Sequence, residues 1–108
     1  MLWHDESDIL DSVAINVLSS KAPLITSCCA LPEVHLHAHR GWGNRPDRCS
    51  AWIWCSHCGL YSHLDGIPLH PDWKNNPEVD FYKVCAVPNY LETVKDSVDK
   101  HLNDYLKI

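Results

Sequence analysis

The chain has 108 residues, with 45% hydrophobic and 21% charged side chains and a formal net charge of −5. This length fits one globular domain, and the composition excludes an intrinsically disordered chain and, because the apolar runs are short, a membrane-spanning helix. The acidic balance disfavours a general nucleic-acid binder, since phosphate contacts require Lys and Arg, and favours a basic protein as the partner.

The start of the chain is acidic and has no basic stretch followed by an apolar one, so we expect no secretory signal and a cytoplasmic location. In a reducing cytoplasm the six cysteines are more typical of metal binding than of a disulfide framework. Buried thiols and a redox pair are the alternatives.

A first helix is predicted over residues 5–21. Its apolar residues recur at helical spacing and form one stripe that we expect to pack on the core: Ile9, Leu10, Val13, Ala14, Val17 and Leu18. Asp5 or Ser7 can cap the helix, and Pro23 ends it. The acids near its start form a dense negative patch and a candidate partner-binding surface: Asp5, Glu6, Asp8 and Asp11.

Between residues 28 and 66 the hydrophobic period changes to two, which predicts an antiparallel sheet. In the first strand, Val34, Leu36 and Ala38 alternate with a polar outer face of histidines: His35, His37 and His39. A second strand covers 51–55, and a third covers 60–64 and ends at the Asp65-Gly66 turn signal.

Two more elements follow towards the end of the chain. A strand is predicted over residues 79–87, which are rich in β-branched and aromatic side chains and include Cys85 as a buried thiol. A last helix is predicted over residues 89–107, with Asn89 and Glu92 at the spacing of a capping box.

The segment Cys55-Ser56-His57-Cys58-Gly59 carries the clearest chemistry. Two thiolates three positions apart, on a turn closed by a glycine, predict half of a structural zinc site. A thioredoxin-like redox pair is the alternative, but it requires a helix after the motif, and strand patterns lie on both sides here.

A structural zinc needs four ligands, and Cys28 and Cys29 are the best source of the other two. Side chains of adjacent residues normally diverge, so a set that uses only one of this pair stays open. The alternative ligands are His35, His37, His39, Cys49, His57 and His63.

The order of ligands, strand, loop, strand and CxxCG over residues 28–59 resembles a zinc ribbon. The segment from Trp54 to Leu60 is similar to the second half of the very short zinc ribbons of the restriction-alleviation family. Together with the helical patterns, the resemblance implies an α+β fold. We expect a small antiparallel sheet with a zinc-ribbon-like hairpin, flanked by N- and C-terminal helices.

The loop between the first two strands is a rival interaction surface. It combines arginines with a tryptophan, residue types that are enriched at protein-binding hot spots and that also stack on unpaired bases. The candidate residues are Arg40, Trp42, Arg45 and Arg48.

Three functional classes follow from these features. The first is a non-catalytic, zinc-stabilised inhibitor, such as an immunity protein or antitoxin that neutralises a basic toxin. The alternative is a zinc-ribbon accessory factor that binds nucleic acid or the transcription or restriction machinery. The third is a small zinc hydrolase that uses the histidine strand, which we disfavour because no acid lies nearby to complete such a site. We therefore expect that the protein is not an enzyme.

Overall fold

The computed structural model describes residues 2–5 and 8–107. Its elements, in chain order, are α1 (Asp8–Ser20), β1 (Val34–Arg40), the short 3-10 helix η1 (Trp42–Asn44), β2 (Arg48–Cys55), β3 (Tyr61–Pro68), a second 3-10 helix η2 (Phe81–Lys83), α2 (Asn89–Thr93) and α3 (Lys95–Leu106). The three strands form one antiparallel sheet with β2 in the centre. The expected α+β class, with helices at both ends of the chain, is confirmed. No helix in the described ranges is long and apolar enough to cross a bilayer.

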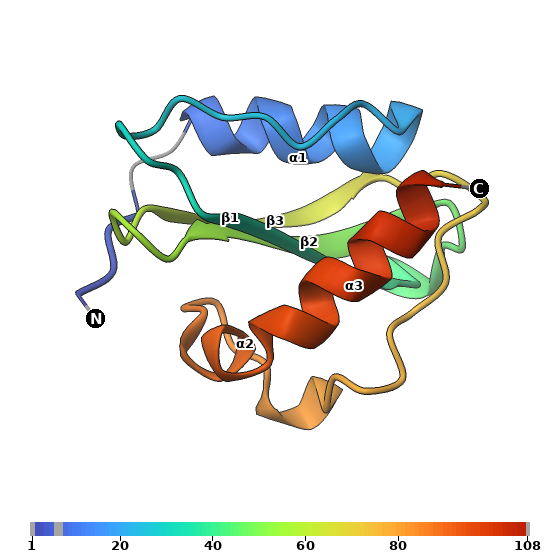
Figure 1. Ribbon diagram of the computed structural model, residues 1–108. Coiled ribbons are helices and arrows are strands. Elements are labelled where there is room, and N and C mark those ends of the chain that lie inside the picture. The colour runs from blue at the N-terminus through green and yellow to red at the C-terminus, as the bar shows by residue number, and fades with distance from the viewer. Residues whose placement is uncertain (1, 6–7, 108) are drawn as a thin grey trace.

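The sheet lies between two helical layers (Figure 1). Helix α1 covers one face, and its Leu10 and Val17 join the buried cluster that contains Leu36 of β1 and Ile53 of β2. The C-terminal helices lie on the opposite face, where a second buried cluster forms: Trp52, Trp54, Val79, Leu91 and Val98. Both faces of the sheet are therefore buried, so polar side chains on either face of the strands can lie in the protein interior.

The histidines of β1 are therefore not a polar outer face, and that prediction is wrong. His35 and His37 are only 2% and 3% exposed. They lie on the face of β1 that α3 covers, and Trp54 and Trp52 stand beside them on β2. β1 forms where the alternation predicts a strand, but a second helical layer covers the face that carries the histidines.

Helix α1 begins at Asp8 rather than at residue 5, and its proposed cap Ser7 lies outside the described residues. At the other end Lys21 adopts a left-handed conformation, with φ of 55°. The amide of Lys21 donates to the carbonyl of Val17, which is the bond of an αL helix end, and the amide of Ala22 donates to the carbonyl of Asn16. The helix thus ends through its own backbone bonds.

Strand β3 is longer than the sequence predicted. Opposite Cys49 and Ser50 the register shifts by one residue, which leaves Gly66 unpaired with φ of 68°. The glycine forms a bulge within the strand pair instead of a turn, so β3 continues past Asp65 to Pro68. The predicted end of the strand at Asp65-Gly66 is therefore wrong.

The strand predicted over 79–87 is also wrong. This segment contains only η2, whose cap Asp80 accepts a hydrogen bond from the amide of Tyr82. It pairs with no strand of the described sheet, and Val79 and Val84 instead contact the tryptophan cluster, so tertiary packing overrides β propensity. Cys85, predicted to be buried, is exposed.

The last predicted helix, 89–107, is broken in two. Val94, with φ of −117°, separates α2 from α3. The side chain of Asn89 accepts a hydrogen bond from the indole of Trp3 at 2.8 Å instead of capping a helix. Leu91 of α2 and Val98 of α3 contact the same apolar cluster, so the break allows both helices to pack on one sheet face.

Candidate metal centre

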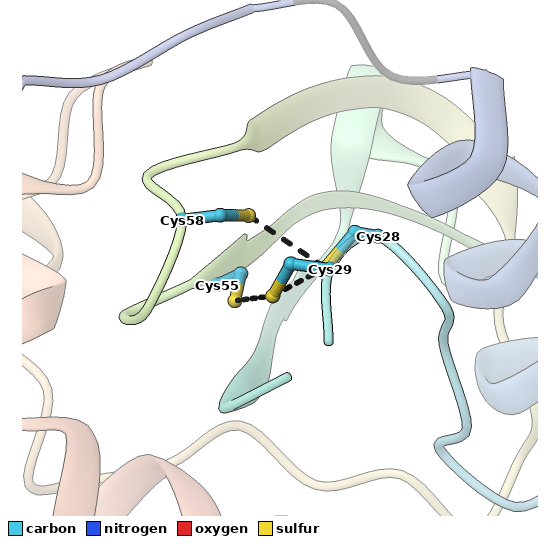
Figure 2. Close-up of side chains that lie close together, drawn as sticks. All are labelled: Cys28, Cys29, Cys55 and Cys58. Atoms are coloured by element: carbon cyan, nitrogen blue, oxygen red, sulfur yellow. Dashed lines mark hydrogen bonds between the residues drawn. The ribbon is translucent and has the colours of Figure 1, made fainter. Parts of the chain in front are cut away.

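Four cysteine sulfurs converge at one end of the sheet (Figure 2). The Sγ atoms of Cys28, Cys29, Cys55 and Cys58 all lie within 4.8 Å of one another. Cys29 Sγ is 3.9 Å from both Cys28 Sγ and Cys55 Sγ, and Cys58 Sγ is 3.7 Å from Cys28 Sγ. A tetrahedron with zinc–sulfur bonds of about 2.3 Å has sulfur–sulfur edges of about 3.8 Å. The cluster therefore has the dimensions of a four-thiolate metal site.

Two separate segments supply the sulfurs. Cys55 is the last residue of β2, and Cys58 lies in the tight turn between β2 and β3. That turn is closed by Gly59, whose amide donates to the carbonyl of Cys55 at 3.0 Å. Gly59 has φ of 80°, and a Cβ atom there would lie 2.5 Å from the carbonyl oxygen of Leu2. Only glycine fits both the turn and the N-terminal segment that passes beside it.

Cys28 and Cys29 come from the irregular segment that precedes β1. The backbone bends at residues 28–31, so the two adjacent side chains turn towards the same point instead of diverging as in a straight segment. Both sulfurs of the pair belong to the cluster. The set that contains all four cysteines, one of the two predicted sets, is the one that the structure brings together.

The cysteines differ in how readily they lose their protons. Burial alone would raise the pKa of Cys55, but backbone N–H groups of Cys58, Glu33 and His57 outweigh it and lower the pKa to about 7. The Glu33 amide lies 3.4 Å from the sulfur. Burial raises the pKa of Cys28 to about 12, and it also raises the pKa of Cys29. A bound cation would be needed to hold all of these sulfurs as thiolates at neutral pH.

None of the six alternative ligands belongs to this cluster, and the described residues contain no second cluster of three or more Cys, His, Asp or Glu side chains close enough to hold a metal. Cys49 is fully buried in the core below α1, where burial raises its pKa to about 12. His39 and His63 stack on aromatic rings, His57 is exposed on the turn, and His35 and His37 are buried under α3. The buried histidine strand also offers no cluster of the kind that the hydrolase hypothesis requires.

The arginine loop is less free than the sequence suggests. Arg40 donates to the carbonyls of Pro46, His70 and Trp73, so its guanidinium holds the chain after β3 in place. Arg45 pairs with an acid two residues away, and Arg48 donates to a β3 carbonyl. Because the donors of Arg40 are used within the fold, they are less available to a partner, and its partner-binding role stays a prediction. Trp42 is 45% exposed and its ring lies over the glycine bulge of β3.

The acidic patch is only partly available as a surface. Asp5 and Asp8 are exposed, whereas Asp11 accepts a hydrogen bond from the hydroxyl of Ser62 in β3. Glu6 lies outside the described residues. Among the described acids of this patch, Asp5 just before α1 and Asp8 in its first turn are therefore exposed to solvent.

No known family model, curated protein or solved structure matches this chain. The zinc-ribbon resemblance of residues 28–59 consequently stays a prediction, and the case for a metal site depends on the geometry of the cysteines.

Proposed function

We propose that the four cysteines bind one structural Zn²⁺ and that the protein is a non-catalytic binding module stabilised by this ion. The convergence of four sulfurs within 4.8 Å carries the proposal. Thiolates favour zinc among the common divalent ions, and four thiolates in a tetrahedron are typical of closed structural sites. Such a site leaves no open position for a substrate or a reactive water.

The position of the cluster supports a structural role. It joins the segment around Cys28 and Cys29, which has no helix or strand in its described part, to the turn between β2 and β3. A bound ion would tie this irregular segment to the end of the sheet where β2 leads into β3, and would thereby fix the start of β1. The free energy of metal binding is then also free energy of folding.

For the partner, we propose a basic protein, with the chain acting as an inhibitor such as an immunity protein or antitoxin. The support is the net charge of −5 and the exposure of Asp5 and Asp8 at the start of α1. An acidic surface accelerates the encounter with a basic partner and disfavours nucleic acid.

Elemental analysis of protein purified without added metal tests the first part of the proposal. We expect about one zinc per chain and a large fall in the thermal midpoint after treatment with a strong chelator. Metal-free protein with an unchanged cooperative transition would contradict the structural site.

The second part is tested with the protein that co-purifies with the chain from its native host. Reversal of Asp5 and Asp8 to lysine should lower the association rate, and the effect should weaken as salt is added. The matched control reverses Asp96 and Asp104, two exposed acids of α3, which gives the same charge change on a different element. Equal association rates for the two double variants would contradict a surface at the start of α1.

Trp42 gives the nucleic-acid alternative its own test, because its ring is 45% exposed. A titration of labelled single-stranded DNA at physiological salt should show no binding in the micromolar range. Micromolar binding that Trp42→Ala abolishes would favour the accessory-factor alternative, since non-specific attraction to a chain of charge −5 cannot explain it.

A further inference from the structure

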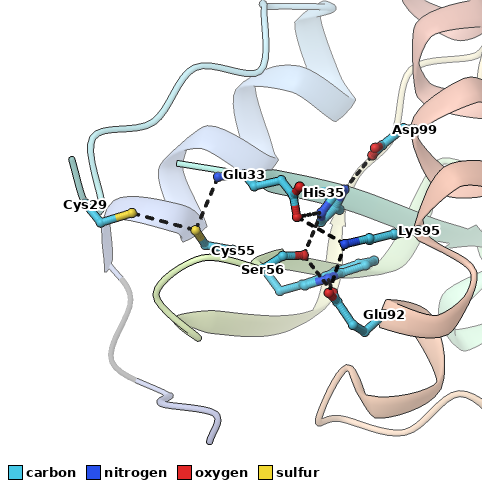
Figure 3. A network of polar contacts seen from close by, with 9 residues as sticks. Cys29, Glu33, His35, Cys55, Ser56, Glu92, Lys95 and Asp99 are labelled. Atoms are coloured by element: carbon cyan, nitrogen blue, oxygen red, sulfur yellow. Dashed lines mark hydrogen bonds and ion pairs between the residues drawn. The ribbon is translucent and has the colours of Figure 1, made fainter. Parts of the chain in front are cut away.

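His35 connects the C-terminal helices to the turn that carries the metal-binding cysteines (Figure 3). Its Nδ1 lies 2.6 Å from a carboxylate oxygen of Asp99 on α3. Its Nε2 lies 2.8 Å from the hydroxyl of Ser56 and 3.4 Å from a carboxylate oxygen of Glu33. The ring is 2% exposed, so these contacts form in an almost dry environment, where they are strong.

The surrounding charges complete the network. Glu92 accepts hydrogen bonds from Ser56 at 2.8 Å and from the indole of Trp54 at 2.7 Å. Lys95 lies between Glu33, at 3.2 Å, and Glu92, at 3.4 Å. The network thus joins α2, α3, the start of β1 and the end of β2.

Ser56, His35 and Asp99 have the order and spacing of a serine-hydrolase triad, but the protons are placed differently. The Ser56 hydroxyl has a single proton, and it points to Glu92, whose carboxylate can only accept. Nε2 of His35 must therefore donate to Ser56, while Nδ1 donates to Asp99. His35 is an imidazolium in this arrangement, so it cannot act as the base of a triad.

The two residues that Nε2 contacts also flank the sulfur of Cys55. Ser56 follows Cys55 in the chain, and its amide donates to the carbonyl of Glu33 at 2.8 Å. The amide of Glu33 in turn lies 3.4 Å from Cys55 Sγ. His35 therefore holds both neighbours of one predicted ligand, although it does not contact the metal cluster itself.

We propose that His35 is a positioning residue for the metal centre, which orients Cys55 through Ser56 and Glu33 and couples metal retention to the docking of α3. This inference rests on the proposed zinc site. Partners of metal ligands typically change metal affinity by about 10- to 100-fold when they are removed. Because such coupling is reciprocal, loss of the metal should also loosen α3.

His37 offers a matched control within the same strand. It lies two residues from His35 on the same sheet face and is 3% exposed, but its Nε2 has no hydrogen-bond partner among the described residues. We compare zinc release to a chromogenic chelator from wild type, His35→Gln and His37→Gln, each under conditions where circular dichroism shows a folded protein. His35→Gln should release zinc about 10- to 100-fold faster than wild type, and His37→Gln should release it at the wild-type rate.

Two further measurements keep the test decisive if His35→Gln does not fold. Ser56→Ala removes the hydroxyl between His35 and Glu92 and should accelerate zinc release several-fold. In wild type, chelation should increase amide hydrogen exchange in residues 95–106. Equal release rates from all variants, with exchange in α3 independent of metal, would overturn the positioning role while leaving the zinc site intact. A wild-type protein that binds no zinc would instead overturn the proposed function.

Discussion

The sulfur of Cys29 lies 3.9 Å from that of Cys55, although Cys29 is the direct neighbour of Cys28, whose sulfur faces the same point. A zinc ribbon with two CxxC motifs would have two cysteines three positions apart before the first strand, where this chain has Cys28 and Cys29. Here the bend at residues 28–31 achieves the same convergence with adjacent residues. Each member of the pair should consequently be needed for a four-thiolate site.

Cys29→Ser should lower zinc affinity by more than about 100-fold, because it removes a ligand and not merely a neighbour of one. Competition with a chelator of known affinity measures the change. Cys85→Ser is the control, since Cys85 is exposed and lies outside the cluster, and it should bind zinc as wild type does. Wild-type affinity of the Cys29 variant would revive the predicted sets in which a histidine completes the site.

The reactivity of the thiols gives an independent prediction. In zinc-loaded protein only Cys85 should react quickly with a thiol reagent, because it is the exposed cysteine of the six. A chelator should release the four clustered cysteines for reaction. Cys49, which is fully buried and has its pKa raised to about 12 by burial, should react only after unfolding. Fast reaction of five thiols before chelation would contradict a metal-protected cluster.

The role of Arg40 in the fold leads to a stability prediction. Its guanidinium donates to several carbonyls at once, a pattern that the single ammonium group of lysine cannot reproduce. Arg40→Lys should lower the free energy of unfolding by about 1–3 kcal/mol. Arg45→Lys, at an exposed ion pair in the same loop, should change it by less than about 0.5 kcal/mol. Urea denaturation measures both, and equal effects would contradict the assignment of Arg40 to the fold.

The elements with a clear period were predictable from the sequence. The stripe from Leu10 to Leu18 specified α1, and the alternation around Ile53 specified β2, because each pattern reports which side chains must be buried. The spacing of Cys55 and Cys58 with Gly59 identified half of the four-cysteine cluster for a similar reason. A glycine-closed turn brings two sulfurs together over few residues.

The parts of the fold that the sequence did not predict depend on contacts between segments that are distant in the chain. Alternation in β1 separates His35 from Leu36, but it does not reveal that α3 covers the histidine face. Asp99 is the one sequence feature that could have indicated a covered histidine face, because it is an acid on a helix that must pack against the sheet. No local pattern, however, links Asp99 to His35, which lies 64 positions earlier in the chain. The β-prone segment near Phe81 stays irregular because no sheet edge accepts it, which is again a property of the whole fold.

Burial of His37 should make the protein less stable in mild acid. Burial, together with the nearby His101 and His39, lowers the pKa of His37 from 6.5 to about 3. Below about pH 6.5, His37 is therefore protonated in the unfolded chain but stays neutral in the folded chain. The free energy of unfolding consequently decreases as the pH drops below about 6.5. His37→Gln should remove a slope that approaches about 1.4 kcal/mol per pH unit. Urea denaturation of zinc-loaded wild type and variant between pH 5.5 and 7.5 measures the difference.

His35 should show the opposite pH dependence. Burial alone would lower its pKa, but the hydrogen bond and charge of Asp99, assisted by Glu33, outweigh burial and raise the pKa above 6.5. A raised pKa contributes stability that is fully present below the unfolded value and is lost as the pH rises through the folded value. The difference in unfolding free energy between wild type and His35→Gln should therefore shrink from pH 6 to pH 8. The corresponding difference between wild type and His37→Gln should change mainly below pH 6.5. Parallel pH profiles for the two variants would contradict a charged His35 beside a neutral His37.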